Sequence, residues 1–428
     1  MSNMIYKKEK KILFLILLLA FLVRFVSSYI ILDEMPKTYG WHHIASNVIK
    51  GHKTLLQSGY YSREYDMRVV FNYYTVRPPV NVLFNIIMIY FFKESMFFYI
   101  LFQSLIATLI VYISFKIFSL KFPVKISILG TAIVCFYPGF ISRVWNATED
   151  NFFILFILYS IYFIFVYLSR RELKYLRYSS LFIGLSFLTR STILPFVFLL
   201  IIFLLFFIKE RKMVLILNSA GVILLTISPL LIYHFSIYNK VLLSDHSWGR
   251  FWVANNKYIA GQFPRTSIDK IEYQMSQDLS KEDYMKLSRM SHLEKEKFFL
   301  HKAFSFIKEN PGPYLSCVFK KVISVFSISY NPHSKSKDMR TRQLVHLLTY
   351  VPILMIGIMG YALYFKAAPL ENLIMIIFYL SLIILAAVFW AHTRHTIPYH
   401  FTFIYGILLF LDQNKWAGKI LIKNQLNG

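Results

Sequence analysis

Two pairs of neighbouring carboxylates are the residues of this 428-residue chain whose type and position could do chemistry. Asp33 and Glu34 follow directly after a long apolar run, and Glu149 and Asp150 directly precede another one. A carboxylate within reach of a hydroxyl group can act as a general base and remove its proton. The alternative is structural: the acids are solvated helix ends, or first-turn acids of a helix that Thr148 caps.

Basic residues occupy similar boundary positions. Arg77 precedes two prolines, Arg190 lies between two apolar runs, and Arg394 and His395 lie between the last two runs. An arginine guanidinium binds a phosphate with two parallel hydrogen bonds. Any one of these side chains could instead extend to lipid headgroups from a helix end. Taken together, their shared depth favours capture of an anionic lipid head, and we predict Arg77, Arg190, Arg394 and His395 as phosphate-binding residues.

The composition indicates the class of protein. The chain is 57% hydrophobic and only 16% charged, with a mean hydropathy of +0.51, whereas soluble domains are nearer half apolar and a quarter charged. Repeated apolar runs of about 18 or more residues are typical of a polytopic membrane protein. The net charge of +25 comes from basic residues that separate these runs, which favours anionic lipids over nucleic acid as partners. Two cysteines, far apart in sequence, predict neither a disulfide scaffold nor a thiolate metal site.

The apolar runs predict an all-α integral membrane protein with about 10–11 transmembrane helices. With the N-terminus in the cytoplasm, most basic clusters fall inside only if the short run 78–92 does not cross. We therefore predict ten spans, with 78–92 lying in or dipping into the outer leaflet. The spans are expected at about 11–32, 97–119, 124–141, 150–168, 178–190, 191–208, 213–234, 344–365, 371–390 and 396–412, with 178–190 the weakest.

This topology divides the chain into three parts. Residues 1–234 form a transmembrane module with a first outer loop at 33–77. Residues 235–343 form a long extracytoplasmic loop with a small helical subdomain, where helical spacing runs over 281–309 and ends at Asn310-Pro311-Gly312-Pro313. Residues 344–428 form the C-terminal transmembrane helices and a short cytoplasmic tail.

Several chemistries lack their motifs in this sequence. It has no glycine-rich phosphate loop, no Ser-His-Asp order and no nucleotide fingerprint. His392 and His395 have helical spacing, but no third ligand is adjacent, which disfavours zinc. An enzyme of this kind would need an activated donor that is delivered within the membrane.

A series of short motifs runs through the chain in a fixed order. They are Asp33-Glu34 followed by Ile44-Ala45, Asn47 and Gly51; Arg77-Pro78-Pro79; Phe136-Tyr137-Pro138 with Thr148-Glu149; Gly184-Leu185-Ser186-Phe187-Leu188-Thr189-Arg190; Pro229 with Ser244 to Trp248, Trp252 and Asn255-Asn256; and Arg394 with Pro398. In number and order they resemble the GT-C superfamily of polyprenyl-phosphate-sugar-dependent glycosyltransferases. Within it, the chain is similar to the protein mannosyltransferase-like and lipid A aminoarabinose transferase-like branch.

The resemblance implies a GT-C-like fold with outer juxtamembrane helices, in a bacterial inner or plasma membrane. It implies inverting transfer of a sugar from a polyprenyl-phosphate donor to a hydroxyl of a glycan, lipid or protein acceptor at the outer face. Asp33 would be the base, Glu149 a second acid, and Arg77, Arg190 and Arg394 would hold the departing phosphate. No cofactor is certain; Asp33 with Glu149 could supply oxygen ligands to a divalent metal, which is a hypothesis.

Two departures from the family pattern leave alternatives open. Residues 35–38 resemble an insertion, so Glu34 remains an alternative base. Tyr233-His234-Phe235 stand where the family has Arg-Asn, which leaves the acceptor open.

Two other classes of function compete with this interpretation. A surface-polysaccharide polymerase or ligase would use a diphosphate-linked oligosaccharide and tolerate loss of Asp33. A lipid transporter or flippase would place polar residues near the bilayer midplane, usually on inverted repeats.

Overall fold

The computed structural model describes residues 2–30, 45–46, 49, 79–93, 95–145, 149–208, 211–264, 266, 268–329 and 339–414. Asp33, Glu34 and Arg77 therefore lie outside the described residues. Every regular element within the described part is helical, which confirms the predicted fold class. The elements are α1 (Ser2–Ile30), α4 (Pro79–Phe92), α5 (Met96–Ser119), α6 (Val124–Phe136), α7 (Pro138–Trp145), α8 (Asp150–Arg170), α9 (Leu173–Phe187), η2 (Ser191–Ile193), α10 (Leu194–Phe207), α11 (Lys212–Tyr238), α12 (Ser247–Ala254), α13 (Lys257–Gln262), α14 (Ile268–Gln277), α15 (Lys281–Arg289), α16 (His292–Glu309), α17 (Pro311–Val325), α18 (Met339–Tyr364), η3 (Phe365–Ala367), α19 (Pro369–Val388), α20 (Thr393–Thr396), η4 (Ile397–Tyr399) and α21 (His400–Gln413).

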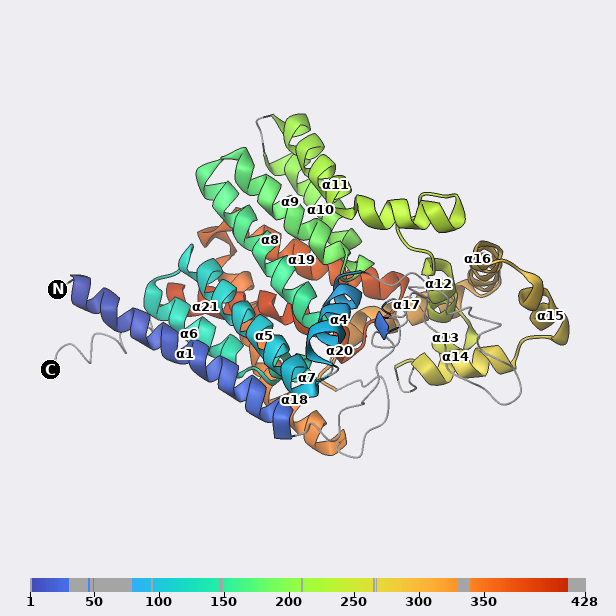
Figure 1. Ribbon diagram of the computed structural model, residues 1–428, viewed down its shortest axis with the longest axis horizontal. Helices are drawn as coiled ribbons and strands as arrows, with labels where there is room; N and C mark the ends of the chain where they lie inside the picture. Colours follow the sequence, from blue (N-terminus) through green and yellow to red (C-terminus); the bar gives the residue numbers. More distant parts are fainter. Residues whose placement is uncertain are drawn as a thin grey trace.

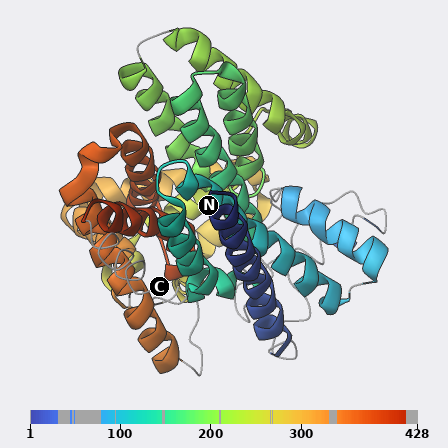
Figure 2. The same cartoon turned by 90° about the vertical axis from the view of Figure 1, so that its left-hand side faces the viewer.

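The long apolar helices form one bundle, and the short helices α12 to α16 gather at one end of it (Figure 1). In the bundle, α1 packs on α5 and α6, α8 on α5 and α9, and α19 on α10 and α17. Figure 2 looks onto the other end, where α1 (dark blue) lies between the orange and red C-terminal helices and the light-blue α4. The bundle has one large apolar core, and the short helices have a second core around Trp252, Ile271 and Phe299.

Six helices of the described part are long and apolar enough to cross a membrane, or up to seven if one bent pair counts as a span. The bent pair is α6 and α7, which meet at an angle of 51° where the sequence predicts one span at 124–141. The other predicted ranges also carry helices, but some are short. The helix α9 has 15 residues, and α10 and α21 have 14 each, or about 21–23 Å. The short helices η2 and η4 precede α10 and α21 and lengthen the segments at 191–208 and 396–412.

The pair α18 and α21 packs closely because glycines face each other. A Cβ at Gly360 would overlap the backbone carbonyl of Gly406, and one at Gly357 would overlap the backbone of Phe403. Small residues allow helix backbones to approach within a membrane, where there is no hydrophobic drive between helices. These contacts fix α21, and with it the short helix α20 that precedes it.

The predicted helix at 281–309 is two helices, α15 and α16, which separate at Met290-Ser291. Ser291 begins α16 with a capping box: its backbone N–H donates to a Glu294 carboxylate oxygen at 2.7 Å. The predicted stop at Asn310 is confirmed, because α16 ends at Glu309. Pro311 begins α17, since proline at the first helical position lacks only an N–H that would have no helical partner.

Candidate active site

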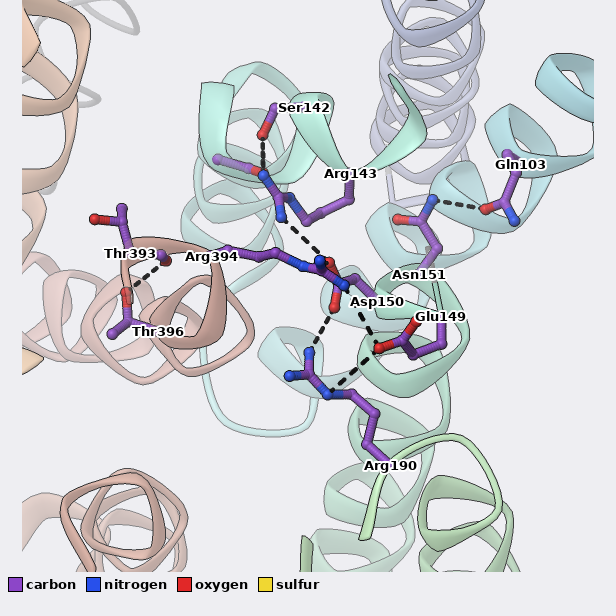
Figure 3. A network of polar contacts seen from close by, with 11 residues as sticks. Gln103, Ser142, Arg143, Glu149, Asp150, Asn151, Arg190, Thr393, Arg394 and Thr396 are labelled. Carbon is purple, nitrogen blue, oxygen red and sulfur yellow. Dashed lines mark hydrogen bonds and ion pairs between the residues drawn. The ribbon is translucent and has the colours of Figure 1, made fainter. Parts of the chain in front are cut away.

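Charged side chains from four segments meet at the end of the bundle where α8 begins (Figure 3). Arg143 comes from α7, Glu149 and Asp150 from the start of α8, Arg190 from the turn after α9, and Arg394 from α20. The N-terminus of a helix carries a partial positive charge, which stabilises acids in its first turn. The start of α8 therefore places both carboxylates where arginines from the other three segments can reach them.

Asp150 is the centre of this cluster and is completely buried. Its Oδ1 accepts a hydrogen bond from Arg190 Nη1 at 2.5 Å, and its Oδ2 accepts bonds from Arg394 Nε at 3.0 Å and Arg143 Nη1 at 3.2 Å. A buried carboxylate needs paired and hydrogen-bonded partners to stay ionised. Because three guanidinium groups surround it, Asp150 is held as an anion.

Glu149 shares two of these arginines. Its Oε1 lies 3.5 Å from Arg394 Nη2 and 4.0 Å from Arg190 Nε. Its Oε2 is buried and has no hydrogen-bond partner in the part of the chain that the structure describes. Three arginines thus face two carboxylates, so the cluster carries one net positive charge. The free lone pairs of Glu149 Oε2 can accept a hydrogen bond from a hydroxyl group.

The position of Arg143 follows from a break in the bundle. The helix α6 ends at Phe136, Tyr137 has extended backbone angles, and Pro138 begins α7, since proline disfavours the helical conformation of the residue before it. The carbonyls left open at the end of α6 need donors inside a membrane. Arg24 of α1 supplies them: Nη1 donates to the Cys135 carbonyl at 3.0 Å and Nη2 to the Val134 carbonyl at 3.2 Å.

Arg190 stands on a turn that is held from several sides. Its own backbone N–H donates to the Ser186 carbonyl at 2.8 Å, and the Leu188 carbonyl accepts a bond from the Val80 N–H at 3.2 Å. The guanidinium carbon lies 5.7 Å from the centre of the Phe153 ring, a cation–π distance. These contacts link the start of α4 to the turn and aim the guanidinium at the start of α8.

His395 lies beside the same cluster on α20. Its Nδ1 accepts a weak hydrogen bond from the His392 N–H at 3.4 Å. Burial lowers the pKa of His395 well below its ordinary value, and the neighbouring Arg190, His392 and Arg394 lower it further, against the opposing charge of Asp150. At neutral pH His395 is therefore an uncharged imidazole that can offer an N–H donor but no positive charge.

The structure brings together Glu149, Arg190, Arg394 and His395, four of the seven predicted site residues. Asp33, Glu34 and Arg77 lie outside the described residues. From the sequence, Asp150 was a candidate acid beside Glu149 but received no role of its own, because a first-turn acid is explained by its helix. Arg143 was not among the predicted site residues. The signal that could have found them is their spacing: the two lie seven residues apart at one outer boundary, next to Glu149.

The described residues contain no group of three or more His, Cys, Asp or Glu side chains that could hold a metal ion. The net positive charge around Glu149 and Asp150 also opposes a cation at these two carboxylates alone. A divalent metal at these carboxylates would need further ligands, for which the sequence offers Asp33 and Glu34, and the proposed mechanism does not depend on one.

These features define a polytopic, all-α membrane protein with a charged site at one end of its bundle. Residues 76–233 match the family described as dolichyl-phosphate-mannose-protein mannosyltransferase; they include Glu149, Asp150 and Arg190 but not Arg394. No curated protein matches the chain.

Solved structures with the same fold come from Archaeoglobus fulgidus. The archaeal oligosaccharyltransferase AglB in complex with an inhibitory peptide and a dolichol-phosphate matches with a TM-score of 0.54 and 13% identity, over 98% of this chain and 52% of the other. The apo form of the Archaeoglobus fulgidus oligosaccharyltransferase matches with a TM-score of 0.51 and 13% identity, over the same shares. This chain spans about half the length of these structures. Its fold is that of the GT-C superfamily, and the family match supports membership of that superfamily.

Proposed function

We propose that this protein is an integral membrane glycosyltransferase. It transfers a sugar from a polyprenyl-phosphate-linked donor to a hydroxyl group of a glycan, lipid or protein acceptor. The observation that carries the proposal is the meeting of Arg190 and Arg394 beside Glu149 and Asp150, at the end of an apolar bundle. The partial match to a dolichyl-phosphate-mannose-protein mannosyltransferase family supports the donor class.

In this mechanism the arginines stabilise the leaving group. As the acceptor oxygen attacks the anomeric carbon, the bond from that carbon to the phosphate oxygen breaks, and negative charge develops on the lipid phosphate. Arg394 and Arg190 are already oriented by the two acids, so they bind this charge without reorganising. Arg77 and the N–H of His395 are further donors in the proposal. Loss of one such donor typically costs about 3–4 kcal/mol in the transition state.

The base in this proposal is Asp33, with Glu34 as its alternative. The last residue of α1 is Ile30, three residues before Asp33, and α1 packs against α7, the helix that carries Arg143. The helix α1 therefore ends on the side of the bundle that borders the site, and Asp33 follows it in the sequence. Asp33 would take the proton from the acceptor hydroxyl, and attack opposite the leaving phosphate inverts the anomeric carbon. Glu149 Oε2, as an unpaired acceptor, would hold a substrate hydroxyl.

We place the reaction at the outer face of a bacterial plasma membrane, with the N-terminus in the cytoplasm. The basic residues that separate the apolar runs support this orientation by the positive-inside rule. The similar oligosaccharyltransferase was solved with a dolichol-phosphate, which is consistent with a membrane-borne donor for this chain.

The test is transfer of labelled sugar from polyprenyl-phosphate-sugar to endogenous lipid, glycan or protein in membranes that contain the wild type or Asp33→Asn. Transfer by the wild type and its loss in the inserted, folded variant would support both the function and the base. The conservative change Glu282→Gln, at an exposed position on α15, is the matched control and should transfer normally.

Other outcomes favour other assignments. Equal transfer by wild type and Asp33→Asn makes Glu34→Gln the next variant. Activity with only a diphosphate-linked oligosaccharide would favour a polymerase or ligase. Movement of lipid without a new glycosidic bond would favour a transporter.

A further inference from the structure

A chain of hydrogen bonds crosses the core behind the site, and the proposed mechanism does not use it. Tyr137 Oη and His400 Nδ1 are 2.6 Å apart, and His400 Nε2 and Thr396 Oγ1 are 2.9 Å apart. The Thr396 hydroxyl donates its one hydrogen to the Thr393 carbonyl at 2.9 Å. Thr396 must therefore accept from His400 Nε2–H, which leaves Nδ1 as the acceptor for the Tyr137 hydroxyl.

All three side chains of this chain are buried. Tyr137 is 4% exposed, Thr396 3% and His400 not at all. The Tyr350 ring stacks on the His400 ring with 4.2 Å between their centres, which fixes the ring plane. Because a buried donor or acceptor has no water to replace a lost partner, each link of such a chain constrains its neighbours.

The two ends of the chain lie next to the arginines of the site. Tyr137 is the residue between α6 and α7, and α7 carries Arg143. Thr396 ends α20, two residues after Arg394. Arg143 and Arg394 both bind Oδ2 of Asp150, at 3.2 Å and 3.0 Å. The chain therefore joins the two segments that must be aligned for both guanidinium groups to share one oxygen atom.

We propose that Tyr137, His400 and Thr396 are positioning residues that hold α20 against the α6–α7 break and so aim Arg394 at the donor phosphate. The proposal rests on the proposed function for its activity readout, but its structural part can be measured without any activity. His400 acts through its neighbours and is not a catalytic residue.

The activity test uses variants that remove or retain one hydroxyl group. Thr396→Val keeps the shape and removes the link, and Thr396→Ser retains it. We expect Thr396→Val to raise the KM for the donor about three- to tenfold, the effect of one hydrogen bond, and Thr396→Ser to restore most of the affinity. Tyr405→Phe is the matched control, because the buried hydroxyl of Tyr405, on the helix α21 that His400 begins, has no hydrogen-bond partner among the described residues. It should behave as wild type.

A double-mutant cycle separates positioning from a general effect on folding. In an Arg394→Gln background, Thr396→Val should cause little further loss in transfer per folded molecule, because the residue through which it acts is gone. Additive losses in the two backgrounds would overturn the proposal, as would an equal loss in Thr396→Ser and Thr396→Val.

A labelling experiment keeps this inference distinct from the proposed function. The two native cysteines, Cys135 and Cys317, are buried, so a thiol reagent reports on Arg394→Cys. Adding Thr396→Val or Tyr137→Phe should change the labelling rate about three- to tenfold, whereas adding Tyr405→Phe should not. If the wild type transfers no sugar, the proposed function fails and this result still decides the positioning role. Unchanged labelling in both test variants would refute it.

Discussion

The change Asp150→Asn tests the charge balance of the site most directly. Asparagine keeps the size of the side chain but removes the charge, so the cluster changes from one net positive charge to two. Arg190 and Arg394 would keep Glu149 as a neighbour, at 4.0 Å and 3.5 Å. Arg143, whose side chain is 5% exposed, would face an amide in place of the carboxylate at 3.2 Å. Removing one partner of a buried ion pair typically costs about 3–5 kcal/mol.

Replacing the partner Arg143 by an uncharged residue provides the comparison. Arg143→Leu leaves Asp150 with Arg190 and Arg394, so it should cost less than Asp150→Asn. In the double variant, the cluster returns to one net positive charge, and part of the loss should be recovered because the buried Arg143 is no longer present without its counter-charge. Thermal or denaturant unfolding of the purified protein in detergent gives these differences, with Glu282→Gln as the control at an exposed ion pair.

The order of stability among the three variants tests this charge balance. If Asp150→Asn unfolds at the same temperature or denaturant concentration as the wild type, the arginines do not depend on the charge of Asp150. If Arg143→Leu is the more damaging single change, packing of the arginine stem outweighs the ion pair. If the double variant is the least stable of the three, the two residues do not act as a pair.

Three further predictions concern other parts of the molecule. Gly360→Ala should destabilise the α18–α21 pair by about 1–3 kcal/mol through overpacking, and Gly221→Ala, where a Cβ meets nothing within 4 Å, should be tolerated; equal unfolding curves would contradict this. Burial raises the pKa of Glu296 from 4.5 to about 7, so the folded chain keeps a proton that the unfolded chain has released. The helices α12 to α16 should therefore lose about 3 kcal/mol of stability between pH 4.5 and 7, and Glu296→Gln should remove that loss; a wild type insensitive to pH in this window would oppose the assignment. Arg394→Lys should reduce transfer at least tenfold while shifting the melting temperature little, because lysine cannot bind bidentately; a large loss of stability with normal transfer would reverse the roles.

Much of the bundle could be predicted from the sequence because its signal is local. An apolar run of about twenty residues has few alternatives to a membrane helix. The break at Tyr137-Pro138 was harder to predict, since residues 124–141 form a single apolar run. Proline disfavours the helix before it, but the bend persists because Arg24, 111 residues away from Cys135, satisfies the open carbonyls. A contact between residues that far apart produces no periodic pattern in the sequence.

The site was predictable in part for a related reason. Glu149, Arg190 and Arg394 each stand at a boundary between apolar runs, so their common depth follows from the sequence. Their mutual distances depend on how α8, the turn after α9 and α20 pack, which is a property of the whole bundle. Asp150 was noticed as a candidate acid but received no role in the site, because one local explanation, a first-turn acid, accounted for it. Two of its three arginine partners come from 40 and 244 residues away, beyond any sequence pattern.

The exposed fractions of the three arginine side chains suggest different roles for them, either in pairing with Asp150 or in binding an anion. Arg143 is 5% exposed, Arg190 12% and Arg394 35%, while Asp150 beneath them is fully buried. Because Arg394 is the most exposed of the three, an anion that reaches the cluster from solvent would meet it first and compete with acids that are already ion-paired. In the proposed function, one donor phosphate would neutralise the single excess positive charge of the cluster without displacing Asp150. In that proposal the deepest arginine, Arg143, mainly keeps the carboxylate ionised, and the outermost one, Arg394, binds the phosphate.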